Sequence, residues 1–298
     1  MMAPDYHTFT GRDGEVIPRH VTHVLIAKAL KFVPARAFEW HPNIEEVICR
    51  DGVEKVEKHA FWQCPRLQRV IMPGVKVIEA SAFFQCFALT YIECGKLERI
   101  GQWAFHLCES LSSIDLPSIK IVEMRAFSVS RNLTHVKFGK DLETIGERAF
   151  FSCTSLQRIA LPLKNGRMAD DNTFQECENL NHVDLVEGSV LRETVATLLM
   201  EEWKNDMNEE IQNISQILPN TPAGSVNPDD VDEPGRKARM IRRWIRSVLR
   251  KIVDYKAEHR RHLNVAATAL QAALPNDIVL KNVLPFLELP SYTFEGEN

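Results

Sequence analysis

The chain has 298 residues, of which 45% are apolar and 26% are charged, a composition typical of a globular protein with a sizeable core. Its net charge of −4 argues against a general, charge-driven affinity for nucleic acid. The first residues lack the basic and apolar regions of a secretion signal, and the most apolar early stretch, 21–33, is too short to span a membrane. We therefore expect a cytoplasmic protein, with a nuclear location as the alternative.

Residues 1–20 are expected to be an N-terminal lead-in to a repeat array. An Ala-Phe dipeptide recurs along the chain, with successive phenylalanines 22 to 24 positions apart, and the last copy has Thr in place of Ala. A fixed period of this length is the signature of a solenoid in which each repeat forms one coil. The repeat phenylalanines are Phe38, Phe61, Phe83, Phe105, Phe127, Phe150 and Phe174.

Each copy aligned on its phenylalanine reads A-F-x-x-C-x-x-L-x-x-I-x-L, as in A-F-F-S-C-T-S-L-Q-R-I-A-L from Ala149. The last two apolar positions flank a variable one, which is the pattern of a short strand with one buried face. Pro or Gly follows these strands and ends them. We predict an α/β-type repeat solenoid over residues 21–189, with short parallel strands and a core built from stacked coils.

All seven cysteines fall at positions that the repeat directs inward. Five lie three residues after the repeat phenylalanine, where His41 and Ser130 stand in other copies, and Cys49 and Cys94 take an inward strand position. No C-x-x-C pair occurs, so we expect neither a metal site nor another cofactor. An odd number of cysteines without a secretion signal favours buried free thiols over disulfides.

The variable strand positions point away from the core, because side chains alternate along a strand. They are either a plain solvated face or a binding strip. Charges of both signs in the middle of the strip suit a protein or peptide better than a polyanion or a small-molecule substrate. The candidate partner-binding residues are Arg69, Tyr91, Glu93, Asp115, His135, Lys137, Arg158 and Asp184.

The repeat pattern ends near residue 189. Residues 190–218 have helical periodicity and an acidic face, which predicts a helix that caps the solenoid. Residues 219–235 form an acidic, proline-rich linker that we expect to be disordered.

Residues 236–274 are predicted to form a long basic amphipathic helix, which Pro275 ends. Three interpretations remain open for it. It could pack on the acidic helix, bind an acidic partner protein, or contact a membrane surface or nucleic acid through residues 236–262. Its candidate contact residues are Arg239, Arg242, Arg243, Trp244, Arg246, Arg250 and Lys251.

Residues 275–298 form a short apolar tail. The segment Leu274–Leu287 resembles the opening of an F-box, although the second half of that motif is absent. The tail therefore either docks on the repeat body or recruits a ubiquitin ligase.

The repeat A-F-x-x-C-x-x-L-x-x-I-x-L-P resembles the BspA-like class of leucine-rich repeats over residues 21–187. The ending N-V-L-P-F-L is similar to leucine-rich-repeat proteins that are expanded in unicellular algae. The resemblance implies a right-handed open solenoid that serves as a protein-interaction surface, and it supplies no catalytic residues. Because no nucleotide-binding or hydrolase motif occurs either, we expect a non-enzymatic scaffold for a protein or peptide partner. The alternatives are a ubiquitin-ligase adaptor and a membrane or nucleic-acid tether.

Overall fold

The structure is a computed structural model that describes residues 6–12, 14–162, 169–186 and 236–273. The described residues fall into two compact units. The first holds the repeats and the beginning of helix α3 (Arg236–Ala273), as far as Arg242, and the second holds the rest of α3. The predicted acidic helix 190–218, the linker 219–235 and the tail 275–298 with its F-box-like segment lie outside the described residues.

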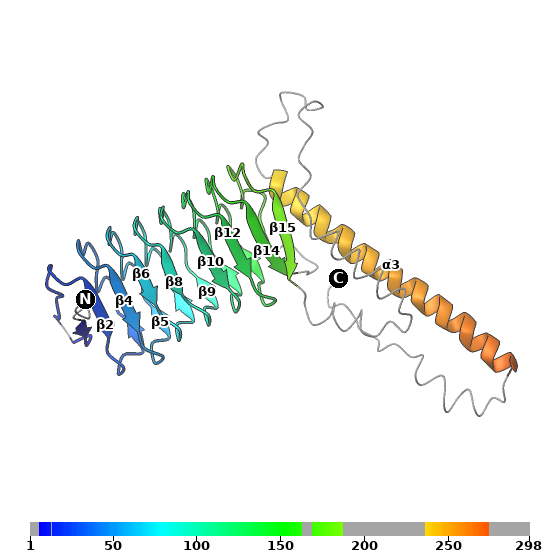
Figure 1. The fold of residues 1–298 in the computed structure, drawn as a ribbon, viewed down its shortest axis with the longest axis horizontal. Coiled ribbons are helices and arrows are strands. Elements are labelled where there is room, and N and C mark those ends of the chain that lie inside the picture. Colours follow the sequence, from blue (N-terminus) through cyan, green and yellow to red (C-terminus); the bar gives the residue numbers. More distant parts are fainter. Residues whose placement is uncertain (1–5, 13, 163–168, 187–235, 274–298) are drawn as a thin grey trace, which may run out of the picture. The chain divides into compact units, whose positions relative to one another are not determined.

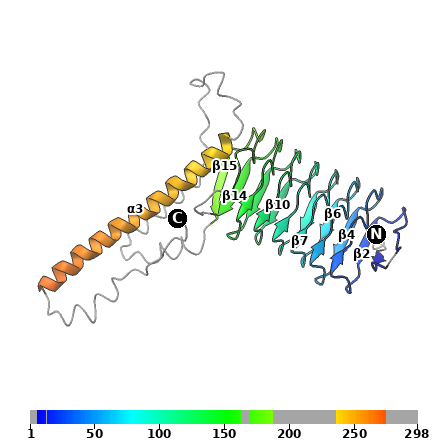
Figure 2. The ribbon, with the colours of Figure 1, turned by 180° about the vertical axis from the view of Figure 1, so that it is seen from behind.

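The repeats form a solenoid whose coils contribute strands to parallel walls (Figures 1 and 2). The first wall consists of two sheets. One is β1 (His7–Phe9), β2 (His23–Ile26), β4 (Glu46–Cys49), β6 (Arg69–Ile71) and β8 (Tyr91–Glu93); the other is β10 (Ser113–Leu116), β12 (His135–Phe138), β14 (Arg158–Pro162) and β15 (His182–Val186). The second wall is a single sheet of two-residue strands: β3 (Phe32–Val33), β5 (Lys55–Val56), β7 (Val77–Ile78), β9 (Arg99–Ile100), β11 (Ile121–Val122) and β13 (Thr144–Ile145).

The solenoid begins earlier than the boundary predicted at residue 21. Strand β1 lies within the predicted lead-in and pairs in parallel with β2, so that Phe9 is the partner of Ile26. Both side chains are buried. The lead-in thus supplies a further strand that covers the first coil.

The inward side chains form continuous columns, as the repeat pattern predicted. In β10 and β12, exposed and buried residues alternate, and Ile114 lies opposite Val136 in the parallel register. The Leu position that precedes these strands is also buried, as shown by the zero exposure of Leu67 and Leu111. Each coil alone would leave these side chains in water, so the core exists only because the coils stack.

The Ala-Phe turns form a third wall of the solenoid. The backbone N–H of each repeat phenylalanine donates to the carbonyl of the residue before the next phenylalanine; from Phe105 to Ala126 this distance is 2.7 Å. The rings stack from coil to coil, with centroids 4.9 to 5.2 Å apart between Phe38 and Phe150. Stacked pairs of this kind contribute about 0.5–1.5 kcal/mol beyond burial.

The turns also hold non-glycine residues in the left-handed region of φ. In the coil of Phe127 these are Arg125, at 55°, and the β-branched Val129, at 61°. Such conformations cost about 1–3 kcal/mol each and persist where the surroundings impose them. Here the imposing contacts are the coil-to-coil hydrogen bonds, because the amide of Val129 donates to the carbonyl of Phe151 at 2.7 Å.

The seven cysteines are buried and free. In the turn column, each thiol donates a hydrogen bond to the phenylalanine carbonyl of the preceding coil; from Cys64 to Phe38 the distance is 3.0 Å. Ser130 does the same with its hydroxyl, 2.9 Å from the carbonyl of Phe105. Each position of the column therefore requires a small side chain that donates a hydrogen bond and also tolerates burial.

Candidate functional site

The outward side chains of the first wall lie in two parallel columns, which we call the strand face. The register places Arg69 opposite Tyr91 and Ile71 opposite Glu93 on one sheet. On the other sheet it places Asp115 opposite Lys137 and His135 opposite Arg158. All eight candidate partner-binding residues predicted from the sequence lie in these two columns, on β6, β8, β10, β12, β14 and β15.

The N-terminal part of the strand face is internally paired. Arg69 lies between Glu46, with Nε 3.1 Å from Oε1, and the ring of Tyr91, whose centroid is 4.8 Å from the guanidinium carbon. The hydroxyl of Tyr6 also donates to the Glu46 carboxylate, and this contact is the main reason that the pKa of Tyr6 is raised. The charge of Arg69 is thus balanced, while Tyr91 keeps 45% of its surface exposed.

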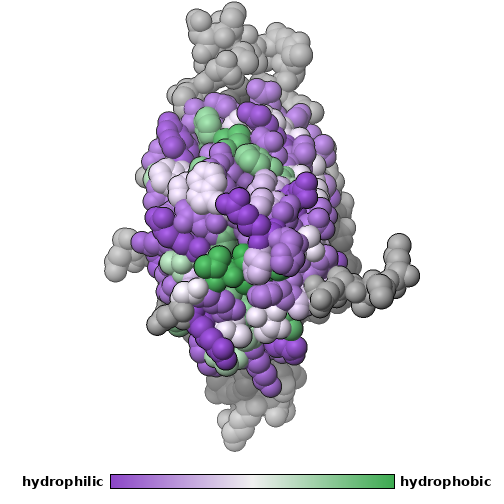
Figure 3. Space-filling model, turned by 90° about the vertical axis from the view of Figure 1, so that its left-hand side faces the viewer, coloured by the Kyte–Doolittle hydropathy of each residue, from purple (hydrophilic) through white to green (hydrophobic). Residues whose placement is uncertain are grey.

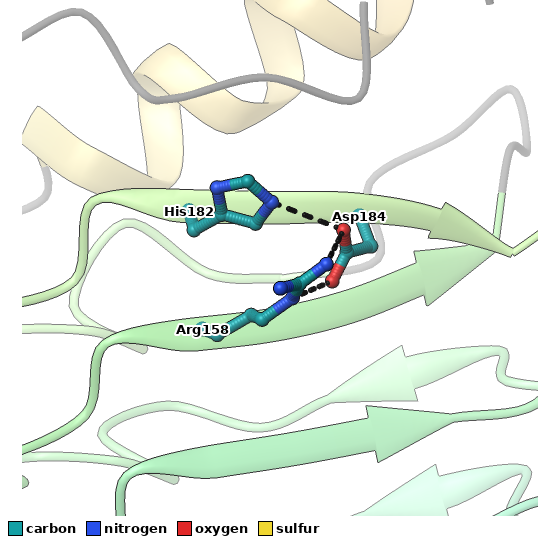
Figure 4. A network of polar contacts seen from close by, with 3 residues as sticks. All are labelled: Arg158, His182 and Asp184. Atoms are coloured by element: carbon teal, nitrogen blue, oxygen red, sulfur yellow. Dashed lines mark hydrogen bonds and ion pairs between the residues drawn. The ribbon is translucent and has the colours of Figure 1, made fainter. Parts of the chain in front are cut away.

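The C-terminal part of the strand face is also paired (Figure 4). Arg158 binds both carboxylate oxygens of Asp184, with Nη2 2.7 Å from Oδ1, and the Nε2 of His182 lies 3.1 Å from the same oxygen. Burial of Asp184 works to raise its pKa, but the hydrogen bonds and charge of Arg158 outweigh burial and hold the pKa below its usual value. A bidentate pair of this kind fixes both side chains.

The middle of the strand face differs, because its charges are unpaired within the described residues. Glu93, Asp115 and Lys137 are exposed, and their side chains form no hydrogen bond or ion pair with any residue that the structure describes. His135 is exposed as well, and within the described residues the one hydrogen bond of its ring joins Nδ1 to the hydroxyl of Thr134, at 2.8 Å. Together with Tyr91, these four residues make a mixed-charge centre between two neutralised ends.

No metal site or membrane span emerges from the part of the chain that the structure describes. Within it, no three His, Cys, Asp or Glu side chains converge as metal ligands would. No described helix combines the length and the apolar character that a membrane crossing requires.

Comparison with known proteins assigns this chain to a family. Residues 31–120 and 98–191 match the family model of the BspA type leucine rich repeat region, in six copies, so that the match covers more than half of the 298 residues. The chain belongs to the BspA-type leucine-rich repeat family. Its repeats generally serve as protein-interaction scaffolds, and leucine-rich-repeat solenoids are generally non-catalytic.

The chain is also similar to parts of several solved structures. A leucine-rich repeat protein from T. pallidum is 21% identical, with 60% of this chain and 83% of that chain covered and a TM-score of 0.38. Another, from Bacteroides ovatus, is 23% identical over 57% of this chain and 56% of that chain, with a TM-score of 0.40. The comparison with curated proteins found no match.

A second surface of the BspA-type repeats, on the turn wall, was missed by sequence reasoning. Trp40, Trp62, Phe84 and His106 form a row of rings whose successive centroids lie 5.0 to 5.8 Å apart. Trp40 is 61% exposed, and the buried Nε1 of Trp62 has no hydrogen-bond partner among the described residues. The available signal was the position directly after the repeat phenylalanine, which holds Trp62, Phe84 and His106, with Trp40 one residue further along its own copy.

The same first coils carry other exposed apolar side chains. Val16 and Phe32 are 83% and 45% exposed. On the end of the repeats seen in Figure 3, apolar side chains reach the surface in separate patches divided by polar ones.

The first residues of α3 are held by the last coil of the repeats. Arg242 donates to the carbonyl of Ala169, at 2.5 Å, and to the carboxylate of Asp171, which lies 3.9 Å from Arg239. Lys237, which sequence reasoning also missed, donates to the carbonyls of Cys177, Glu178 and Leu180, and burial lowers its pKa.

The other candidate residues of α3 belong to the second unit. Arg243, Arg246 and Arg250 are exposed and Trp244 is half-buried. Lys251 lies on the same helix. Of the seven candidate contacts of the basic helix, two are therefore engaged by the repeats and three, Arg243, Arg246 and Arg250, are exposed.

Proposed function

We propose that this chain is a non-enzymatic scaffold that binds a protein or peptide partner at the centre of its strand face. The centre consists of Tyr91, Glu93, Asp115, His135 and Lys137. The observation that carries the proposal is the contrast along the strand face: charges at both ends are paired within the chain, while those at the centre have no described partner. Exposed charges of both signs beside an aromatic side chain suit a protein surface of complementary charge.

The rigidity of the strand face supports this role. Within each of its two sheets the strands are joined to their neighbours by parallel ladders, and Arg69 and Arg158 are fixed by their ion pairs. A partner would therefore lose little binding free energy to the ordering of the scaffold. The paired ends would act as a rim, with Tyr91 as the aromatic anchor that such interfaces favour.

Site-specific photo-crosslinking tests this proposal. A photoreactive amino acid would replace Lys137 on the strand face or, as the matched control, Lys120 on the second wall. We expect the Lys137 position to crosslink a protein that the Lys120 position does not, and competition by unlabelled wild-type chain to abolish the product. Equal products from both positions, or none from Lys137, would contradict a strand-face site.

A second candidate function is a tether to an anionic surface through Arg243, Arg246 and Arg250. These residues follow one another at helical spacing and are all exposed. Phosphate contacts of this kind weaken steeply with salt. The test compares binding of the full chain and of its triple Arg→Gln variant to duplex DNA and to phosphatidylserine vesicles over a salt series; identical curves for both proteins would exclude this role.

The ubiquitin-ligase adaptor stays a prediction of the sequence, since Leu274–Leu287 lies outside the described residues. Loss of binding to an F-box-recognising adaptor in Leu284→Ala would support it, whereas a wild-type chain that does not bind such an adaptor would exclude it.

A further inference from the structure

The hydrogen-bonded ladder of the first wall is interrupted once, between β8 and β10. The five-stranded sheet ends at β8 and the four-stranded sheet begins at β10, although the same two coils remain joined in the second wall, where β9 pairs with β11. Their phenylalanines, Phe83 and Phe105, also stay stacked at 5.2 Å. The two coils therefore touch along two walls and part along the strand face only.

The interruption leaves backbone groups unpaired. On the coil before it, the amides of Thr90 and Tyr91 both donate to the carbonyl of Gln68, at 2.9 and 3.1 Å. On the coil after it, Thr134 and His135 donate in the same way to Ser112. The corresponding amides at the break belong to Ser112 and Ser113, and among the described residues they have no acceptor. Both residues are exposed.

The break is a window with closed ends. Before it, the amide of Ser110 donates to the carbonyl of Phe87 at 3.1 Å, and after it the hydroxyl of Ser118 donates to the carbonyl of Gly95 at 2.9 Å. Within the window Ile92 is only half-buried, whereas the matching Val70 is fully buried. The opening is therefore local to β8 and β10 and exposes one edge of each.

Two like charges lie on either side of the break in the ladder. Glu93 and Asp115 occupy the same outward column, because Ile71 is the partner of Glu93 and Asp115 is the partner of Lys137. A closed ladder would set the two carboxylates directly opposite each other, which is destabilising. Both charges also act on Cys94. Burial is the main reason that the pKa of its thiol is raised to about 12, and the negative charges of Asp115 and Glu93 contribute to this increase.

We propose that the window between β8 and β10 is the docking site of an extended segment of the partner that carries a Lys or Arg side chain. The segment would accept hydrogen bonds from the amides of Ser112 and Ser113 and would place its cation between Glu93 and Asp115. An extended segment that lies across the opening can accept both hydrogen bonds through its own backbone carbonyls. Tyr91 and Phe87, which are 45% and 40% exposed, supply apolar contact beside the window. This inference rests on the proposed function and specifies the chemistry of its partner.

The first test uses the free protein. Amide hydrogen exchange of the full chain should be at least tenfold faster at Ser112 and Ser113 than at Thr134 and His135, which have acceptors. In the double variant Glu93→Gln, Asp115→Asn the like charges are removed, so the ladder should close and slow the exchange at Ser112 and Ser113. Equal amide exchange rates at these two pairs of residues in the wild-type chain would contradict an open window between β8 and β10.

The second test uses a defined probe, the peptide acetyl-Thr-Val-Lys-Val-Thr-amide, with Glu in place of Lys as its matched control. We expect the Lys peptide to shift the amide signals of Ser112 and Ser113, to bind at least tenfold more tightly than the Glu peptide, and to lose at least tenfold in affinity with Glu93→Gln, Asp115→Asn. The variant Asp141→Asn, at an exposed carboxylate elsewhere, should bind like wild type.

Equal affinity of the double variant and wild type, or no shift at Ser112 and Ser113, would overturn the inference. The proposed function has a separate outcome. If crosslinking at Lys137 still captures a specific partner while the peptide fails to bind, the strand face remains the binding surface and only the basic segment is wrong.

Discussion

The thiol of Cys153 donates a hydrogen bond to the carbonyl oxygen of Phe127, 3.1 Å away on the preceding coil. The same carbonyl also accepts from the amide of Ser130, at 3.2 Å, so loss of the thiol removes one of its two hydrogen bonds, which is worth about 0.5–1.5 kcal/mol. We therefore expect Cys153→Ala to lower the free energy of unfolding by roughly that amount, and Cys153→Ser to lower it less, because Ser130 already fills this position with a hydroxyl. Urea unfolding measures both, and equal losses for Ala and Ser would show that the hydrogen bond is unimportant.

The cysteines should be unreactive in the folded chain. All seven are buried, and burial raises the pKa of Cys64 and Cys177 to about 12, so almost no thiolate exists near neutral pH. We expect an aromatic disulfide reagent at pH 8 to label no thiol in the native protein and all seven in guanidinium chloride. Rapid labelling of one thiol in the native protein would contradict its burial.

The ion pair of Arg158 and Asp184 should make the free energy of unfolding depend on pH in the acid range. The folded-state pKa of Asp184 is lowered below the unfolded value of about 3.9, so its contribution is present above that value and is lost as the pH falls through the lower folded-state pKa. We expect Asp184→Asn to be less stable than wild type at pH 7 and equal to it at the acid end. A stability difference that does not change with pH would contradict this pair. Urea midpoints over a pH series give the comparison.

Lys237 should protect the amides of the last coil from hydrogen exchange. Its ammonium group satisfies three carbonyls at the C-terminal end of the repeats, and hydrogen bonds to charged groups are worth about 1.5–3 kcal/mol. Lys237→Met should raise amide exchange in β15 by at least about tenfold. Exchange in β4 should not change, and a uniform increase along all strands would show a global loss of stability instead of a lost cap.

The periodic positions of the apolar residues were sufficient to predict the coils and the columns of side chains that face the core. Val70, Ile114 and Ile159 are buried because one apolar position per period faces the same core, and this periodicity is written in the sequence. The outward positions of Tyr91 and Lys137 follow from the same alternation. The strand within residues 1–20 escaped prediction because β1 is too short to show a period.

The pairing of the strand face could not be read from the sequence. Whether Arg69 binds Glu46 and Arg158 binds Asp184 depends on the register between coils and on side-chain rotamers. The break beside Glu93 likewise depends on which residue the next coil sets opposite it, a relationship 22 positions away in the chain. Lys237 was overlooked because its acceptors are carbonyl groups, which leave no trace in a residue pattern.

The most direct test of the account is the affinity for the partner captured by crosslinking at Lys137. It would be measured with the wild-type chain, with the strand-face variant Tyr91→Ala, Lys137→Ala, and with the control variant Trp40→Ala, Lys120→Ala on the other two walls. We expect the strand-face variant to bind at least about a hundredfold more weakly, as the loss of an aromatic anchor and a charge implies, and the control to bind like wild type. A control variant that weakens binding as much as the strand-face variant would contradict recognition at the centre of the strand face.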